Sequence, residues 1–154
     1  MKLQDSLNKL DKLSQAVFSK RLLRALLLHQ VLAGAEHRNI LSRNLSTVVD
    51  IGANRGQFAL AVREWAPKAR VISFEPLSSP AAVFRRVFVG DEQVALHNVA
   101  IGPESMTHEI HVSARDDSSS LLPISSLQTT LFPGTEEVAT AEVRVAPLAE
   151  FVSV

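Results

Sequence analysis

The spacing of apolar residues divides the chain at about residue 45. Before this point, apolar side chains recur at steps of three and four residues, the spacing of one face of an α-helix. The stripe is formed by Leu3, Leu7, Leu10, Leu13 and Val17, and it continues through Leu22, Leu23, Leu26, Leu27, Val31 and Leu32. We therefore predict an N-terminal helical segment within residues 1–44, with helix from residue 1 to about 34 and a stop at Gly34.

Strands and helices alternate after residue 45. Residues 47–51 and 70–74 are short apolar runs, typical of strands buried on both faces of a sheet, and 93–99 predict a third strand. A helix is predicted between each pair of strands, the first ended by Pro67 and the second capped by Ser79. This alternation with short connections is typical of a doubly wound parallel sheet, so the predicted fold class is α/β.

The alternation of strands with helices stops after Gly102. Apolar and polar residues alternate over 110–113 and 141–145, which predicts two half-exposed strands that are antiparallel partners. Between them, residues 118–134 are uncharged and rich in Ser, Thr and Pro. A loop of this length inside a compact domain more often covers a binding site than simply connects two strands.

Composition and charge narrow the classes of function. Apolar residues make up 46% and charged residues 21% of the 154, the balance of a globular protein, and the absence of Cys excludes a disulfide scaffold. The net charge is zero, which gives no reason to expect nucleic acid or an anionic membrane as a partner. The charge is nonetheless uneven, +5 over residues 1–44 and −6 over 101–154, and we interpret the two ends as differently solvated surfaces.

No membrane span or secretory signal is found in the sequence. The most apolar stretch near the start, 22–33, is broken by Arg24, His29 and Gln30, whereas a span needs about 20 apolar residues. We therefore expect a cytoplasmic protein. The cations of the N-terminal segment are also typical of a membrane-surface helix, but packing on the main domain, or pairing with a second copy in a homo-oligomer, is favoured.

The candidate chemistry lies in the loop after the first predicted strand. Gly52 to Gly56 is a tight, glycine-containing turn, and such a turn lets a ligand approach the backbone closely. In open α/β sheets, ligands lie at the carboxyl ends of the strands, where this loop is expected. Glu75 ends the next strand, 25 residues after Asp50, and a carboxylate there suits the two hydroxyls of a ribose.

Two classes of cofactor use such a loop, and the residues distinguish them. Dinucleotides such as NAD need G-x-G-x-x-G, but Asn54 stands in place of the second glycine, and Asp50 would repel the pyrophosphate. S-adenosylmethionine has no phosphate and carries an ammonium and a sulfonium, for which Asp50 is favourable. We therefore expect Asp50 and Asn54 to orient the methionine end of S-adenosylmethionine, and Glu75 to hold its ribose.

The same residues resemble a known family. The string Asp50-x-Gly-Ala-Asn-x-Gly56, with Phe74-Glu75-Pro76, is similar to S-adenosylmethionine-dependent methyltransferases of the FkbM type, and the resemblance covers about 45–152. Further similar segments are Asn98 to Gly102, Ser118 to Leu121 and Glu142 to Leu148. The resemblance implies a Rossmann-like sheet of the class I methyltransferase type, a partial cofactor-binding domain at 45–154, and O-methylation of a hydroxyl on a sugar or natural product.

Seven residues are predicted to bind this cofactor: Asp50, Gly52, Asn54, Gly56, Glu75, Asn98 and Val99. Asn98 and Val99 are expected at the border of the adenine. Ser119 and Ser120 are candidates to close over the cofactor or to touch the substrate, which is a small molecule or glycan.

The histidines supply no firm site. His97 lies close to the end of the third predicted strand and is either a base or, as we favour, a hydrogen-bonded core residue. His108 and His111 are three apart on a predicted strand, so they lie on opposite faces and are not expected to share a metal ion. No catalytic base is identified.

The resemblance also implies further sheet beyond Val154, because in that family a fourth parallel strand with an acidic residue follows. We therefore expect the chain to be part of a longer methyltransferase, inactive by itself, with one edge of the strand at 47–51 left bare. Two other functions stay open: an NAD-type dinucleotide-binding oxidoreductase, and a non-catalytic interaction module that pairs through its N-terminal helix.

Overall fold

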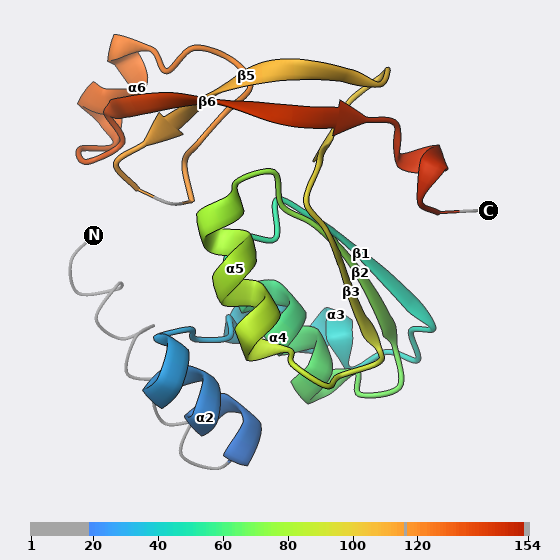
Figure 1. Cartoon of the computed structure of the whole chain (residues 1–154). Coiled ribbons are helices and arrows are strands. Elements are labelled where there is room, and N and C mark those ends of the chain that lie inside the picture. The colour runs from blue at the N-terminus through green and yellow to red at the C-terminus, as the bar shows by residue number, and fades with distance from the viewer. Residues whose placement is uncertain (1–18, 116, 153–154) are drawn as a thin grey trace.

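A three-stranded parallel sheet forms the lower half of the molecule in Figure 1. The computed structural model describes residues 19–115 and 117–152. The sheet joins β1 (Thr47–Ile51), β2 (Arg70–Phe74) and β3 (Val94–His97) in that order. The parallel strands that the sequence predicts at these places are confirmed, although the third is shorter than 93–99.

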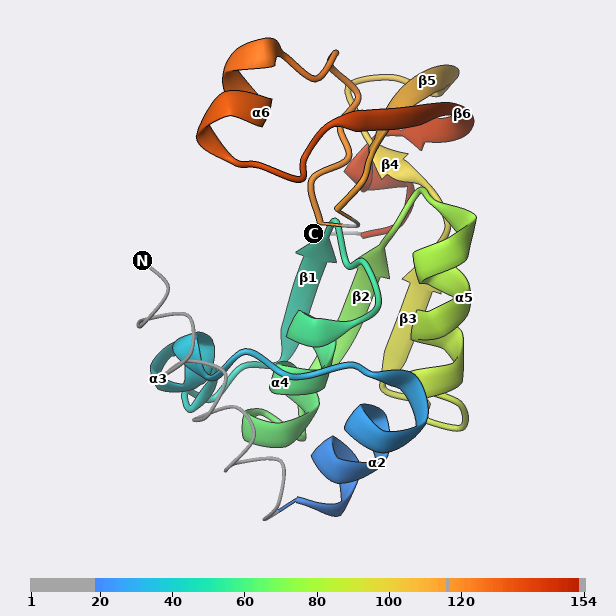
Figure 2. The ribbon, with the colours of Figure 1, turned by 90° about the vertical axis from the view of Figure 1, so that its left-hand side faces the viewer.

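A second, mixed sheet lies across the carboxyl ends of the first (Figures 1 and 2). It joins β4 (Ala100–Ile101), β6 (Glu137–Ala146) and β5 (Met106–Ser113); β5 and β6 are antiparallel, and β4 is parallel to β6. The predicted antiparallel pair is confirmed, with longer strands than expected. Because β4 follows β3 after only two residues, the chain passes directly from one sheet to the other.

Two helices lie on one face of the parallel sheet, and a third packs against these two (Figure 2). The two are α4 (Gln57–Trp65) and α5 (Ser78–Val87), and the third is α2 (Lys20–His29). Their apolar sides meet Val71 of β2 in one core cluster, in which Ala59, Ala61 and Val62 are fully buried. The predicted helices between the strands are confirmed, and α2 shares this core through Leu22 and Ala25.

The opposite face of the sheet is covered by C-terminal residues rather than by a further helix layer in the described part of the chain. Ile72 and Phe74 are buried there against Val99 and Ala146, with Phe151 packed edge-on to Phe74 at 5.3 Å between ring centroids. The described helices thus pack on one face, and the molecule is mixed α/β. A doubly wound sheet stays a prediction.

β1 is more exposed than the sequence predicts. Its Val49 and Ile51 side chains are 36% and 57% exposed, so the expectation that this strand is buried on both faces is wrong. β1 is an edge strand that pairs only with β2 among the described strands, as the expected bare edge requires.

Several helix ends also differ from the predictions. α2 is capped at its end by Gln30 rather than by Gly34. The left-handed backbone of Gln30 (φ 57°) lets its N–H donate to carbonyl oxygens of the last turn. Residues 1–18 of the predicted helix lie outside the described residues. α5 is capped by Leu77, so Ser79 lies inside its first turn. The loop at 118–134 contains a short helix, α6 (Ser126–Leu131).

The remaining elements are short. One-turn segments lie at Ala35–His37, at α3 (Arg38–Leu41) and at Leu148–Glu150. No helix within residues 19–115 and 117–152 is both long and apolar enough to cross a membrane.

Gly56 fixes how closely the glycine loop approaches α5. Its φ is +95°, and a Cβ at this position would lie 2.5 Å from Phe88 Cε2 and 3.0 Å from Phe84 Cδ2. Because Phe84 and Phe88 are both buried and in contact with one another, neither ring can move aside easily. Gly56 is therefore required for packing.

We predict that Gly56→Ala lowers the free energy of unfolding by about 3 kcal/mol, since left-handed strain and overpacking add. Gly90→Ala is the matched control, because Gly90 has φ +79° but a Cβ on it would meet nothing within 4 Å. The control should lose only about 1–2 kcal/mol. Urea unfolding measures both, and equal losses would show that the Phe84–Phe88 contact is not what excludes a side chain.

Candidate functional site

The loop after β1 returns to the end of β2 through its backbone. The amides of Gly52 and Ala53 both donate to the carbonyl oxygen of Phe74, each at 2.9 Å. This path needs left-handed residues, and Gly52 (φ 81°) and Asn54 (φ 49°) provide them. The loop is thereby held at the carboxyl end of the sheet.

Glu75 ties the strand ends together. Its Oε2 accepts the backbone N–H of Asn54 at 2.8 Å, and its Oε1 accepts the N–H of Leu77 at 2.8 Å. From the end of β3, Asn98 donates its Nδ2 to the carbonyl oxygens of Glu75 at 2.6 Å and Pro76 at 2.9 Å. One carboxylate and one amide therefore fix the segments that follow all three parallel strands.

Three buried polar atoms at this place have no hydrogen-bond partner among the described residues. They are Asp50 Oδ2, Asn54 Oδ1 and Ser73 Oγ. Asp50 and Ser73 are paired in the β1–β2 register, so their side chains lie on the same face of the sheet. Leaving a buried polar group unpaired costs about 1–3 kcal/mol. A cluster of three such atoms is typical of a binding site.

Burial perturbs both carboxyl groups of the site. It raises the pKa of Asp50 from 3.8 to about 6, with a further rise from the nearby Glu75 charge. The neighbouring Ser73 hydroxyl opposes this rise, although its Oγ makes no well-formed hydrogen bond within the described structure. Burial also raises the pKa of Glu75, against the effect of the two backbone amides that it accepts. The site thus favours a cation, which would compensate two desolvated carboxylates.

A cavity of about 160 Å³ lies directly above the glycine loop. Its roof is formed by Ile110 of the second sheet and by Asp117 and Ser119 of the segment after β5. Figure 1 shows this sheet above the carboxyl ends of the parallel strands. The cavity is lined by Gly52, Asn54, Glu75, Pro76, Leu77, Ile110, Asp117 and Ser119. Ser119 Oγ accepts the backbone N–H of Ser113 at 3.1 Å, which holds it beneath the end of β5.

The structure brings some of the predicted residues together and separates others. Gly52, Asn54 and Glu75 line the cavity, and Asp50 is buried next to them. Ser119 lines the cavity as expected, whereas Ser120 pairs with His111 through its backbone.

The remaining three predicted residues contact other groups. Gly56 packs on Phe88, Asn98 holds the segment after β2, and Val99 is buried in the core with Ile72. None of the three lines the cavity, so their predicted cofactor contacts stay untested.

Three residues of the site escaped the sequence reasoning. Ser73 is an ordinary strand residue in the sequence, and only the β1–β2 register places it beside Asp50. Ile110 and Asp117 belong to the second sheet and its loop, and nothing in the local pattern indicates that they cover the glycine loop.

A comparison with models of protein families finds one that matches the chain. The sequence model of the methyltransferase FkbM domain matches residues 50–153. The chain belongs to the FkbM methyltransferase family. The match begins at Asp50. It includes the glycine loop, the carboxyl ends of β1 and β2, and the whole second sheet. The resemblance noted in the sequence is therefore confirmed, and no curated protein sequence matches the chain significantly.

Two histidines of the FkbM domain, His97 and His111, contact other side chains of the fold. His97 stacks on Phe74 at 5.2 Å and packs at a tilt on Phe151 at 4.7 Å between ring centroids, and burial lowers its pKa. His111 Nδ1 lies 2.8 Å from Glu137 Oε2. Within the described residues, no three His, Cys, Asp or Glu side chains gather in a way that could hold a metal ion.

The raised pKa of Asp50 makes stability depend on pH in a defined direction. The folded chain binds the Asp50 proton more tightly than the unfolded chain, because the pKa is about 6 rather than 3.8. Asp50 therefore costs no stability at pH values below both pKa values. The cost grows as the pH rises between them and is complete above pH 6.

We predict that Asp50→Asn raises the free energy of unfolding by about 1–3 kcal/mol at pH 7.5 and by much less near pH 4. The substitution removes the charge that burial penalises. Urea unfolding at the two pH values measures the difference, and Glu104→Gln, at an exposed position, is the charge-matched control. A variant that is less stable than the wild type at pH 7.5 would contradict the burial argument.

Proposed function

We propose that this FkbM domain binds S-adenosylmethionine above the β1–β2 strand ends and transfers its methyl group to a hydroxyl oxygen of a sugar or natural product. The observation that carries the proposal is the cluster of unpartnered acceptors: the Oδ2 of Asp50 and the Oδ1 of Asn54, with Ser73 Oγ beside them. A carboxylate and an amide oxygen can only accept, so their missing partner is a donor, and burial favours a charged one.

The residues fit this cofactor better than a dinucleotide. The ammonium of the methionine end would donate to Asp50 and Asn54, which relieves the desolvation that raises the pKa of Asp50. The Glu75 carboxylate accepts one N–H on each oxygen and retains lone pairs for two ribose hydroxyls. A pyrophosphate at the same place would face two buried carboxylates.

Alignment and exclusion of water are the tasks of this chain's residues. S-adenosylmethionine, when bound, supplies a methyl carbon already activated by the sulfonium. Asp50 and Asn54 would orient the methionine end, and Glu75 the ribose, so that the acceptor oxygen meets the methyl carbon in line. Ile110 and Ser119 form a roof that keeps water away from the charged contacts, which strengthens them.

The roof must open for the cofactor to enter. The cavity measures about 160 Å³, below the roughly 300 Å³ at the lower end of ligand pockets. The segment that contains Asp117 and Ser119 is a loop in the roof of the cavity, so its movement would enlarge the cavity without breaking the hydrogen bonds of Glu75. A Rossmann-like, doubly wound class I sheet and a cytoplasmic location are part of this proposal, supported by the parallel β1–β2–β3 order and the absence of Cys.

We predict that S-adenosylhomocysteine binds the chain at pH 7.5 and NAD does not. Affinity should fall about tenfold or more between pH 7.5 and pH 5, because Asp50 becomes protonated below about pH 6. In Asp50→Asn, affinity at pH 7.5 should already be low and nearly independent of pH, while Glu104→Gln should behave as the wild type. Isothermal titration calorimetry at the two pH values measures each case.

Three outcomes would contradict the proposal. Tighter binding of NAD than of S-adenosylhomocysteine would favour the dinucleotide alternative. Unchanged binding in Asp50→Asn would remove Asp50 from the site. Transfer of a radiolabelled methyl group to carbon or nitrogen acceptors, but to no hydroxyl, would leave the cofactor assignment intact and overturn O-methylation.

A further inference from the structure

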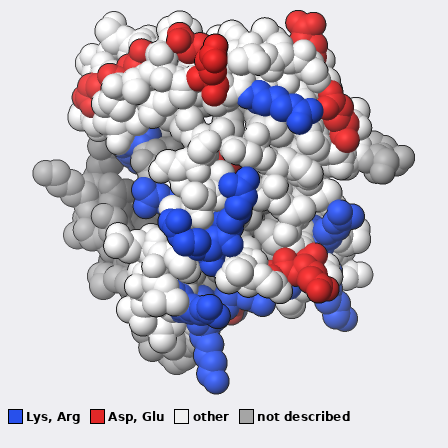
Figure 3. All heavy atoms as spheres, viewed as in Figure 1, with Lys and Arg blue, Asp and Glu red and all other residues white. Residues whose placement is uncertain are grey.

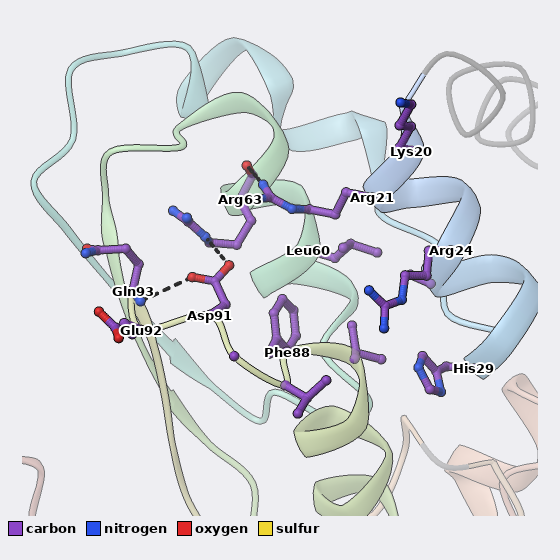
Figure 4. Close-up of a pocket in the computed structure, with 14 residues that line it drawn as sticks. Lys20, Arg21, Arg24, His29, Leu60, Arg63, Phe88, Asp91, Glu92 and Gln93 are labelled. Carbon is purple, nitrogen blue, oxygen red and sulfur yellow. Dashed lines mark hydrogen bonds and ion pairs between the residues drawn. The ribbon is translucent and has the colours of Figure 1, made fainter.

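A groove lies beside the amino end of β3, whereas the glycine loop follows the carboxyl end of β1. The volume of the groove is about 620 Å³, and it separates α2 from α4 and from the turn between α5 and β3 (Figure 4). Its floor is apolar, formed by Ala25, Leu60 and Phe88. Five basic side chains surround it: Lys20, Arg21, Arg24, His29 and Arg63.

Two of these cations maintain the fold. Arg63 is buried and donates to Asp91 Oδ2 at 2.8 Å and to the carbonyl oxygen of Pro67 at 2.5 Å. Arg21 donates to the carbonyl oxygen of Arg63, which fastens α2 to α4. Figure 4 shows the bonds from Arg63 to Asp91 and from Arg21 to the Arg63 carbonyl oxygen; both guanidinium groups are therefore already engaged.

The other cations of α2 are not engaged in this way. Lys20 and Arg24 are exposed and make no hydrogen bond or ion pair with any described residue. In Figure 4 the Arg24 and His29 side chains extend from α2 on one side of the groove, and Glu92 lies on the far side beyond Asp91. The mouth beside α2 therefore carries uncompensated positive charge.

The outer side of α2 is apolar as well as basic. Leu22 and Ala25 are buried against the domain, but Leu23, Leu27 and Leu28 are 37%, 70% and 64% exposed. At 100° per residue, these leucines lie on both sides of the exposed Lys20 and Arg24. A helix that presents leucines and cations together to the outside is typical of one that lies in a membrane interface.

Charge is separated along the molecule despite its net neutrality. Residues 19–44 contain five Lys or Arg and one Asp or Glu, whereas residues 101–154 carry a net charge of −6. In Figure 3 acidic side chains gather over the second sheet, and basic ones over α5 and α2. An anionic surface would attract the α2 end and repel the opposite one, which orients the molecule.

We propose that α2 docks this protein on an anionic lipid surface, with Leu23, Leu27 and Leu28 in the interface and Lys20 and Arg24 on lipid phosphates. Charge complementarity selects this occupant over a second copy, because two α2 faces would bring the same cations together. Residues 1–18, which directly precede α2, contain three Lys and two Asp among further leucines in the sequence, a net charge of +1. The proposal does not depend on the cofactor assignment, because no residue of α2 or of the groove lines the cavity above the glycine loop.

Flotation of the full chain with lipid vesicles tests this docking. We expect binding to phosphatidylcholine vesicles that contain phosphatidylglycerol, little binding to pure phosphatidylcholine, and release at high salt. Lys20→Glu/Arg24→Glu and Leu27→Ser/Leu28→Ser should each reduce the bound fraction about tenfold or more. Arg43→Glu/Lys68→Glu, at exposed positions away from α2, makes the same charge change and should lose much less.

The outcomes are distinguishable because all the substituted side chains are exposed and far-UV circular dichroism verifies that each variant is folded. Equal binding to both kinds of vesicle, or equal losses in the α2 and control variants, would overturn the proposal. So would a doubled mass in solution that Leu27→Ser/Leu28→Ser abolishes without any binding to vesicles, since the leucines would then join two copies of the chain.

Discussion

The carboxylate of Glu75 bridges two loops, and the geometry of the candidate site depends on it. It accepts the N–H of Asn54 from the loop after β1 and the N–H of Leu77 from the segment after β2. Asn98 extends the connection to β3. Burying a carboxylate is costly, as the raised pKa of Glu75 shows, and the two amides offset that cost. An apolar residue at this position would leave both N–H groups unsatisfied and would remove the side-chain bridge between the loop after β1 and the segment after β2.

The same region contains polar groups that its own fold does not satisfy. Asp50, Asn54 and Ser73 hold buried oxygen atoms without partners among the described residues, and burial, with a further rise from the nearby Glu75 charge, raises the pKa of Asp50 to about 6. Folding stability would gain from replacing Asp50, so the arrangement is stable only because the rest of the domain compensates for it. In a member of the FkbM methyltransferase family, a donor that satisfies these acceptors is the simplest reason for such an arrangement.

Local sequence patterns predicted the parts of the fold that depend on local physics. The strand at 47–51, the turn that needs glycine at Gly52 and the helix ended before Pro67 follow from residues close in sequence. The prediction that both faces of β1 are buried was wrong. Burial depends on which other elements cover a strand, and nothing in the described structure covers Val49 and Ile51.

Contacts between distant elements could not be predicted in the same way. Val99 lies two residues after β3, and only the crossing into the second sheet shows that it packs in the core against Ile72; its predicted contact with the cofactor stays a prediction. Asp117 reaches the cavity only because the segment after β5 folds over the glycine loop. No periodicity within either segment carries that information.

The most direct test of the account is the titration of the Asp50 carboxyl group by NMR, on protein labelled with ¹³C at aspartate and assigned with Asp50→Asn. Without ligand, the carboxyl carbon should titrate with a pKa of about 6. With saturating S-adenosylhomocysteine, the pKa should fall below about 5, because a bound ammonium stabilises the carboxylate. A pKa that stays the same when the ligand is bound, or that rises, would contradict the central claim that Asp50 meets the cationic end of the cofactor.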